Sequence, residues 1–162
     1  MNRTAHLGMM VTLALIFSYI EVLIPIQLPI PGVKLGLANI VIVVVLYKWG
    51  FKEAFLVSTI RVIIAGFLFG NPMMILYSLA GCTLSIIAMS LIYKRNSFSI
   101  MGVSILGAIF HNIGQTLVAI IVLESFSIIY YSAILLMSAL ITGLIIGILA
   151  QQLMRMMKGI RD

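Results

Sequence analysis

Residues Pro25 to Ile40 read PIQLPIPGVKLGLANI and contain the only predicted non-helical run longer than a few residues. It holds three of the chain's four prolines: Pro25, Pro29 and Pro31. Because proline fixes φ and has no backbone N–H, the sequence predicts an extended, ordered segment between two helices. The segment is either a rigid turn or a lid over a ligand site. A lid would offer Lys34 as a cationic contact, with Asn39 just inside the next helix.

Composition indicates an integral membrane protein. Of the 162 residues, 63% are hydrophobic and 9% are charged, and the mean hydropathy is +1.25. A chain this apolar cannot cover itself with a water-compatible surface. The apolar runs are continuous, which is typical of spanning helices and not of the alternating strands of a β-barrel. We therefore expect an all-α membrane bundle that forms a single domain over residues 1–162.

Six membrane-spanning helices are predicted, because short polar or proline-containing breaks separate the apolar runs. The break at Gly70, Asn71 and Pro72 is typical of one helix ending and another beginning, since glycine ends helices, asparagine caps them and proline suits the first turn. The expected helices cover about 4–23, 35–49, 53–70, 72–93, 98–123 and 127–157. The second of them is short for a membrane span.

The net charge of +6 reports membrane topology and not nucleic-acid binding, because the basic residues gather at the ends of the apolar runs. On one predicted face lie Arg3, Lys48, Lys52, Lys94, Arg95, Arg155, Lys158 and Arg161. The other face has only Lys34. By the positive-inside rule, both termini are expected in the cytoplasm.

Arg61 lies in the middle of the third predicted helix. A charge at the centre of a span costs about 2.5 to 3.5 kcal/mol on insertion scales, so Arg61 must face the protein interior. It forms either a structural ion pair, for which Glu21 and Glu53 are available, or a ligand or gating contact. We favour the ligand or gating role, because ionisable residues inside membranes usually serve function.

The fifth predicted helix carries a polar patch, His111-Asn112-x-x-Gln115. His111 and Gln115 share a helical face, and Asn112 lies about 100° around from His111. The patch could hold helices together by hydrogen bonds, and His111 alone could equally be a core histidine. Three hydrogen-bonding side chains within five residues exceed that structural need, which favours substrate contact.

The predicted ligand is a small anion, partly aromatic or apolar. Three helices begin at the outer face, so their positive dipole ends would converge on a site there. Lys34 and Arg61 add charge of the same sign, and Tyr77 supplies aromatic surface with a hydroxyl group. Glu21, near the outer end of the first helix, is included in the same candidate site.

Several classes of chemistry lack their residues. The sequence has no P-loop motif for ATP hydrolysis. Its single aspartate is Asp162 and its three glutamates are scattered, so no carboxylate pair is available to hold Mg²⁺ on a diphosphate. We expect no catalytic residues, no metal site and no cofactor, and therefore not an enzyme.

Four stretches carry a family resemblance that covers nearly the whole chain: PGVKLGLANI at 31–40, RVIIAGFLFG at 61–70, YSLAGCTLS at 77–85 and SILGAIFHNIGQTLVA at 104–119. In order and spacing they resemble the bacterial Gx transporter family, also called heptaprenyl diphosphate synthase component I. The resemblance implies a substrate-binding S component of an energy-coupling factor transporter. Such six-helix proteins of the plasma membrane capture micronutrients for a shared ATP-driven module. The cargo expected here is a small anionic micronutrient or an isoprenoid- or quinone-related precursor.

The resemblance also implies partners. S components use an Ala-x-x-x-Ala face on the first helix to meet the transmembrane coupling subunit, and Gly8 and Thr12 occupy the corresponding place here. The expected partners are then a small-molecule substrate, the lipid bilayer, a coupling subunit and its ATPases. The alternative is a membrane accessory subunit of a prenyl diphosphate synthase, although a mere anchor would need neither Arg61 nor the polar patch.

Overall fold

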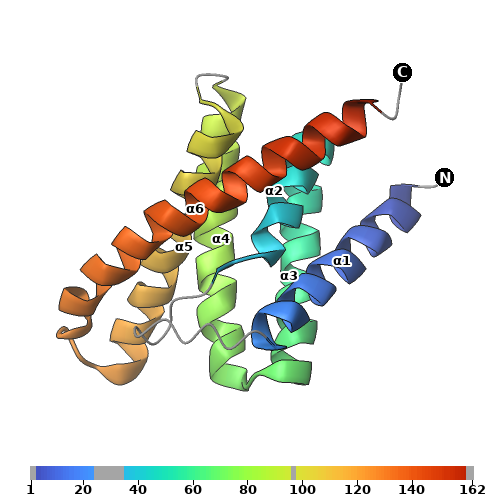
Figure 1. The fold of residues 1–162 in the computed structure, drawn as a ribbon. Coiled ribbons are helices and arrows are strands. Elements are labelled where there is room, and N and C mark those ends of the chain that lie inside the picture. Colours follow the sequence, from blue (N-terminus) through green and yellow to red (C-terminus); the bar gives the residue numbers. More distant parts are fainter. Residues whose placement is uncertain (1–2, 24–34, 96–97, 160–162) are drawn as a thin grey trace.

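The computed structural model describes residues 3–23, 35–95 and 98–159, which are helical and include no strand (Figure 1). The predicted all-α class is therefore confirmed. The described residues form α1 (Arg3–Leu23), α2 (Ala38–Trp49), α3 (Phe51–Phe69), α4 (Pro72–Lys94), α5 (Ile100–Leu123) and α6 (Ile128–Gly159). The greater part of the proline segment, residues 24–34, lies outside the described residues, so the choice between lid and turn stays a prediction.

Among the described residues, four helices are long and apolar enough to cross a membrane, namely α1, α4, α5 and α6. Helix α2 has only 12 residues, and α3 carries Lys52, Glu53 and Arg61. The chain therefore has the helices of a multi-pass membrane protein, and six crossings remain a prediction.

Local sequence signals explain the two tightest connections. Gly50 alone separates α2 from α3 and has φ of 101°, a conformation that glycine adopts at no steric cost. Asn71 caps α4 as predicted, because its side-chain oxygen accepts a hydrogen bond from the Met74 N–H at 2.8 Å. Pro72 occupies the first turn of α4, where a missing N–H has no consequence.

Both ends of the described chain lie at the same end of the bundle (Figure 1). The α2–α3 connection, the end of α4 and the start of α5 are found there too, whereas the α3–α4 and α5–α6 turns lie at the opposite end. The basic residues at the helix ends, including Lys48, Lys52 and Lys94, therefore gather at the end that holds the termini. This is the charge asymmetry on which the predicted orientation rests.

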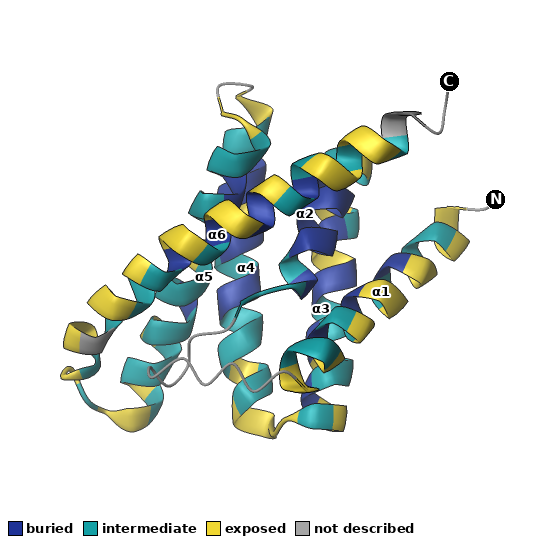
Figure 2. Ribbon diagram, viewed as in Figure 1, coloured by how far each residue is buried: buried dark blue, intermediate teal, exposed yellow. Residues whose placement is uncertain are grey.

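Helix α2 forms the centre of the packed core. Ala38 and every residue from Ile40 to Leu46 are buried, whereas α1 and α6 carry many exposed residues (Figure 2). The helix packs against α1, α3 and α6. Its run of β-branched residues thus faces protein and not lipid.

Glycines allow α5 to approach its neighbours closely. A Cβ on Gly114 would lie 2.7 Å from the Ala80 carbonyl oxygen of α4. On the α6 side, a Cβ on Gly143 would lie 2.7 Å from the Ile105 Cα atom, and one on Gly147 would lie 2.7 Å from the Met101 Cα atom. Small residues are the usual means of packing helices in lipid, where no hydrophobic force drives them together.

Candidate functional site

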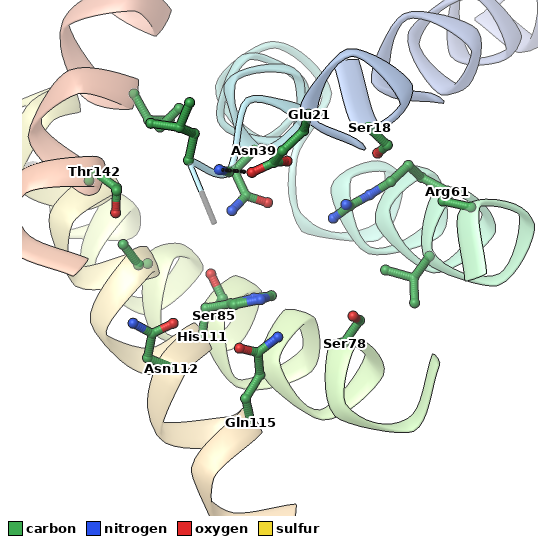
Figure 3. Close-up of a pocket in the computed structure, with 18 of the residues that line it drawn as sticks. Ser18, Glu21, Asn39, Arg61, Ser78, Ser85, His111, Asn112, Gln115 and Thr142 are labelled. Carbon is green, nitrogen blue, oxygen red and sulfur yellow. Dashed lines mark hydrogen bonds between the residues drawn. The ribbon is translucent and has the colours of Figure 1, made fainter. Parts of the chain in front are cut away.

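A cavity of about 290 Å³ lies among the helices, and residues from all six helices of the described chain line it (Figure 3). Its volume is near the lower end of the range of small-molecule sites. Its polar side chains are Ser18, Glu21, Asn39, Arg61, Ser78, Ser85, Ser104, His111, Asn112, Gln115, Ser138 and Thr142.

The cavity brings together most of the substrate contacts predicted from sequence: Glu21, Asn39, Arg61, His111, Asn112 and Gln115. Tyr77 is not in the lining, which corrects its assignment to the site. The lining residues of α4 include Met74, Ser78 and Ser85, and Tyr77 lies about a quarter turn away from the face they share. Lys34 lies outside the described residues.

Arg61 points from α3 into the cavity (Figure 3). Its Nε atom is buried and has no hydrogen-bond partner among the described residues. One terminal nitrogen lies 3.9 Å from the Cys82 sulfur, which is a weak contact. Glu53 forms its ion pair with Arg3, and no ion pair between Arg61 and Glu21 or Glu53 is present. The structural ion pair considered from sequence is therefore not what holds Arg61.

Glu21 connects the end of α1 to the start of α2. Its Oε1 atom accepts a hydrogen bond from the Gly36 N–H at 2.6 Å, and both residues line the cavity. Gly36 has φ of 72°, the left-handed region, so a residue with a side chain would be strained there. The carboxylate is thus fixed by a backbone donor and offers its remaining lone pairs to the cavity.

The polar patch of α5 divides into two roles. Asn112 donates from Nδ2 to the Leu135 carbonyl oxygen at 2.7 Å and so joins α5 to α6, the structural role considered from sequence. Its Oδ1 atom is a further acceptor within the same lining. Gln115 and His111 face the α4 side, where their atoms would lie 3.0 Å from a Cβ on Gly81. Figure 3 shows His111 and Gln115 on the opposite side of the cavity from Glu21 and Asn39.

Sequence reasoning missed the hydroxyl groups of the lining. Serines and threonines inside membrane helices usually bond to their own backbone, and several do so here. Ser18 donates to the Ala14 carbonyl at 2.9 Å, and Ser138 donates to the Leu135 carbonyl at 2.7 Å. Both serines also line the cavity, and a hydroxyl oxygen that donates one hydrogen bond can still accept another. Because such serines look alike wherever they occur, the sequence carries no signal that separates these from packing serines.

The expected convergence of three helix N-termini is only partly present. Gly36 and Asn39 at the start of α2 line the cavity, and so does Met74 in the first turn of α4. The first lining residue of α6 is Ser138, which lies about 15 Å along the helix from its beginning. The prediction for α6 was therefore wrong. Leu37 at the α2 N-cap makes no side-chain cap hydrogen bond, but the Glu21 carboxylate accepts from the Gly36 N–H just before the helix and so places a negative charge at its positive dipole end.

The predicted docking residues lie outside the cavity. Gly8 and Thr12 are exposed on α1, and a Cβ added to Gly8 would meet no atom within 4 Å. Thr12 donates to the Gly8 carbonyl at 3.0 Å, so its polar group is satisfied within the helix. This face is open in the isolated chain, and its role in docking stays a prediction.

A family model described as heptaprenyl diphosphate synthase component I matches residues 10–153. The chain belongs to this family. The match runs from α1 into α6 and includes every residue that lines the cavity. No curated protein and no solved structure gave a match. Among the described residues of this family member, no cluster of three His, Cys, Asp or Glu side chains could hold a metal ion.

Proposed function

We propose that the chain is a non-enzymatic, substrate-binding membrane subunit that takes up a small anionic molecule, energised by a separate ATPase module. The observation that carries the proposal is the Arg61 side chain, which lines a polar cavity and forms no ion pair with Glu21 or Glu53, while its buried Nε atom has no partner among the described residues. A cation inside the bundle without a counter-charge is costly, and an anion in the cavity would supply one at the terminal nitrogens of Arg61. No cofactor is part of the proposal.

The other lining groups refine the chemistry of this ligand. Glu21 and the serine oxygens are acceptors, and Gln115 offers both a donor and an acceptor. A molecule with a carboxylate or phosphate group and hydrogen-bond donors elsewhere would satisfy both kinds of partner. Val43, Val62 and Ile146 add apolar surface to the lining, which suits an aromatic or branched portion of the ligand.

The transport part of the proposal assigns Gly8 and Thr12 to a coupling subunit, with both termini in the cytoplasm of a bacterial cell. A large side chain on this open face would block close helix approach. Gly8→Leu and Thr12→Leu should therefore reduce co-purification with a coupling subunit and its ATPases while ligand binding persists. Unchanged co-purification in both variants would remove the docking assignment.

The family description favours a second candidate, a membrane accessory subunit associated with a heptaprenyl diphosphate synthase. An accessory that only anchors a synthase has no use for Arg61 in a cavity, which is why we place this candidate second. Affinity purification from native membranes separates the two candidates: recovery of a prenyl synthase without an ATPase module would favour the accessory role.

Native mass spectrometry of the purified protein tests the binding function directly, because a ligand carried through purification appears as an added mass. Once that ligand is identified, titration calorimetry should show about ten- to a hundredfold weaker binding for Arg61→Ala, the loss of a charge-assisted contact worth about 1.5 to 3 kcal/mol. Arg155→Ala, an exposed arginine outside the cavity, is the matched control. Equal affinity in both variants would overturn the assignment of Arg61.

A further inference from the structure

A second surface feature lies at the end of the bundle that holds both termini. An open groove of about 570 Å³ is bounded by the starts of α1 and α3 and the ends of α2 and α4. We call it the basic groove, and it is lined by Arg3, Trp49, Phe51, Lys52, Glu53, Ile87, Ser90, Leu91 and Lys94. None of these residues lines the central cavity.

The charges of the basic groove are unbalanced. Glu53 pairs with Arg3 and is largely covered, with a side-chain exposure of 16%. Lys52 and Lys94 are exposed, so the groove keeps two positive charges beyond this ion pair. Lys48 adds a third nearby, since its ammonium lies 4.9 Å from the centre of the Trp49 ring.

Apolar side chains continue the groove down the bundle. On α4, Ile87, Leu91 and Lys94 follow one helical face, and the two apolar residues are 40% and 60% exposed. On α3, Lys52 is followed one turn later by Phe55 and Leu56, which are 36% and 50% exposed. On both helices, exposed apolar side chains therefore lie next to a lysine at the end of the bundle. A phospholipid has the same order of groups, with apolar chains followed by a charged headgroup.

We infer that the basic groove binds the headgroup of an anionic phospholipid, with the acyl chains against the exposed apolar residues of α3 and α4. Basic pockets between membrane helices bind such headgroups by charge attraction. Trp49 fits the same position, because tryptophan is enriched where headgroups meet hydrocarbon. Since each lysine near an anionic surface contributes about fivefold in affinity, two lysines give a preference large enough to measure.

Trp49 is the chain's single tryptophan, so its fluorescence reports occupancy of the groove. The protein is reconstituted in phosphatidylcholine containing a fraction of brominated phosphatidylglycerol or brominated phosphatidylcholine with identical chains, and quenching of Trp49 is compared. We expect the apparent affinity of wild-type protein for phosphatidylglycerol to exceed that for phosphatidylcholine by about fivefold or more. The double variant Lys52→Gln/Lys94→Gln should show a preference at least about fivefold smaller than that of wild type, although Lys48 remains nearby.

Arg155→Gln is the matched control, because Arg155 is an exposed basic residue outside the groove. It should retain the wild-type preference. The inference is overturned if wild-type protein shows no preference for phosphatidylglycerol, or if the double variant keeps the wild-type preference. It is also overturned if Arg155→Gln loses as much of the preference as the double variant, because a general surface potential would then explain the result. Both lysines are exposed, and circular dichroism checks that the double variant keeps its helices.

Discussion

Replacing Arg61 with methionine should stabilise the ligand-free protein. The buried Nε atom has no partner among the described residues, and the contact to Cys82 at 3.9 Å is weak. An unsatisfied buried polar group costs about 1 to 3 kcal/mol, and more if it is charged. Methionine keeps an unbranched apolar stem but has no N–H group, so the free energy of unfolding should rise by about 1 to 3 kcal/mol.

The opposite sign is expected if Arg61 is a structural ion-pair partner, because breaking a buried pair costs about 3 to 5 kcal/mol. Equilibrium unfolding in mixed detergent micelles, followed by circular dichroism, measures the difference. Arg61→Lys keeps a charge at this position and should not show the increase in the free energy of unfolding. Arg155→Met is the matched control, because it makes the same substitution at an exposed position outside the cavity. A loss of about 3 kcal/mol in Arg61→Met would refute the reasoning.

Three further results are expected. Gly114→Ala should lower the free energy of unfolding by about 1 to 3 kcal/mol, because the added Cβ would overlap the Ala80 carbonyl. Gly8→Ala places its Cβ in open space, so the free energy of unfolding should stay the same or rise by up to about 1 kcal/mol. Equal effects of the two substitutions in thermal unfolding would contradict this prediction. Glu21→Ala should lower the free energy of unfolding by about 1.5 to 3 kcal/mol in chemical unfolding, because the Gly36 N–H loses its acceptor. Glu21→Gln should lower it less, because an amide oxygen can still accept the hydrogen bond. Equal losses in the two variants would argue against that hydrogen bond. A C-terminal alkaline phosphatase fusion should be inactive if the termini are cytoplasmic, and activity would invert the membrane orientation.

Features set by local chemistry could be predicted from the sequence. Gly50, Asn71 and Pro72 end or begin helices through their own backbone preferences, so the boundaries they mark lie close to those observed. Arg61 could be assigned to the interior because a charge facing lipid is costly, and the spacing of His111 and Gln115 placed them on one face. These signals depend on few residues and not on the final packing.

Features set by packing could not be predicted. The valine-rich run of α2 looks the same whether it faces lipid or protein, so its central position became visible only in the fold. Tyr77 was misplaced because the orientation of α4 depends on its contacts with α3 and α5. Ser85 and Ser104 gave no signal, since a hydroxyl within a membrane helix has a local backbone acceptor available.

The enclosure of α2 has a consequence for biosynthesis. At 12 residues the helix is about 18 Å long, shorter than the roughly 30 Å of hydrocarbon that a lone span must cross. Its buried residues cluster with Ile146 and Ala150 of α6, which is synthesised after α2 to α5. Until α6 is in place, one side of α2 lacks its protein cover. The cavity, which residues of α1 to α6 line, is therefore completed only after α6 has left the ribosome.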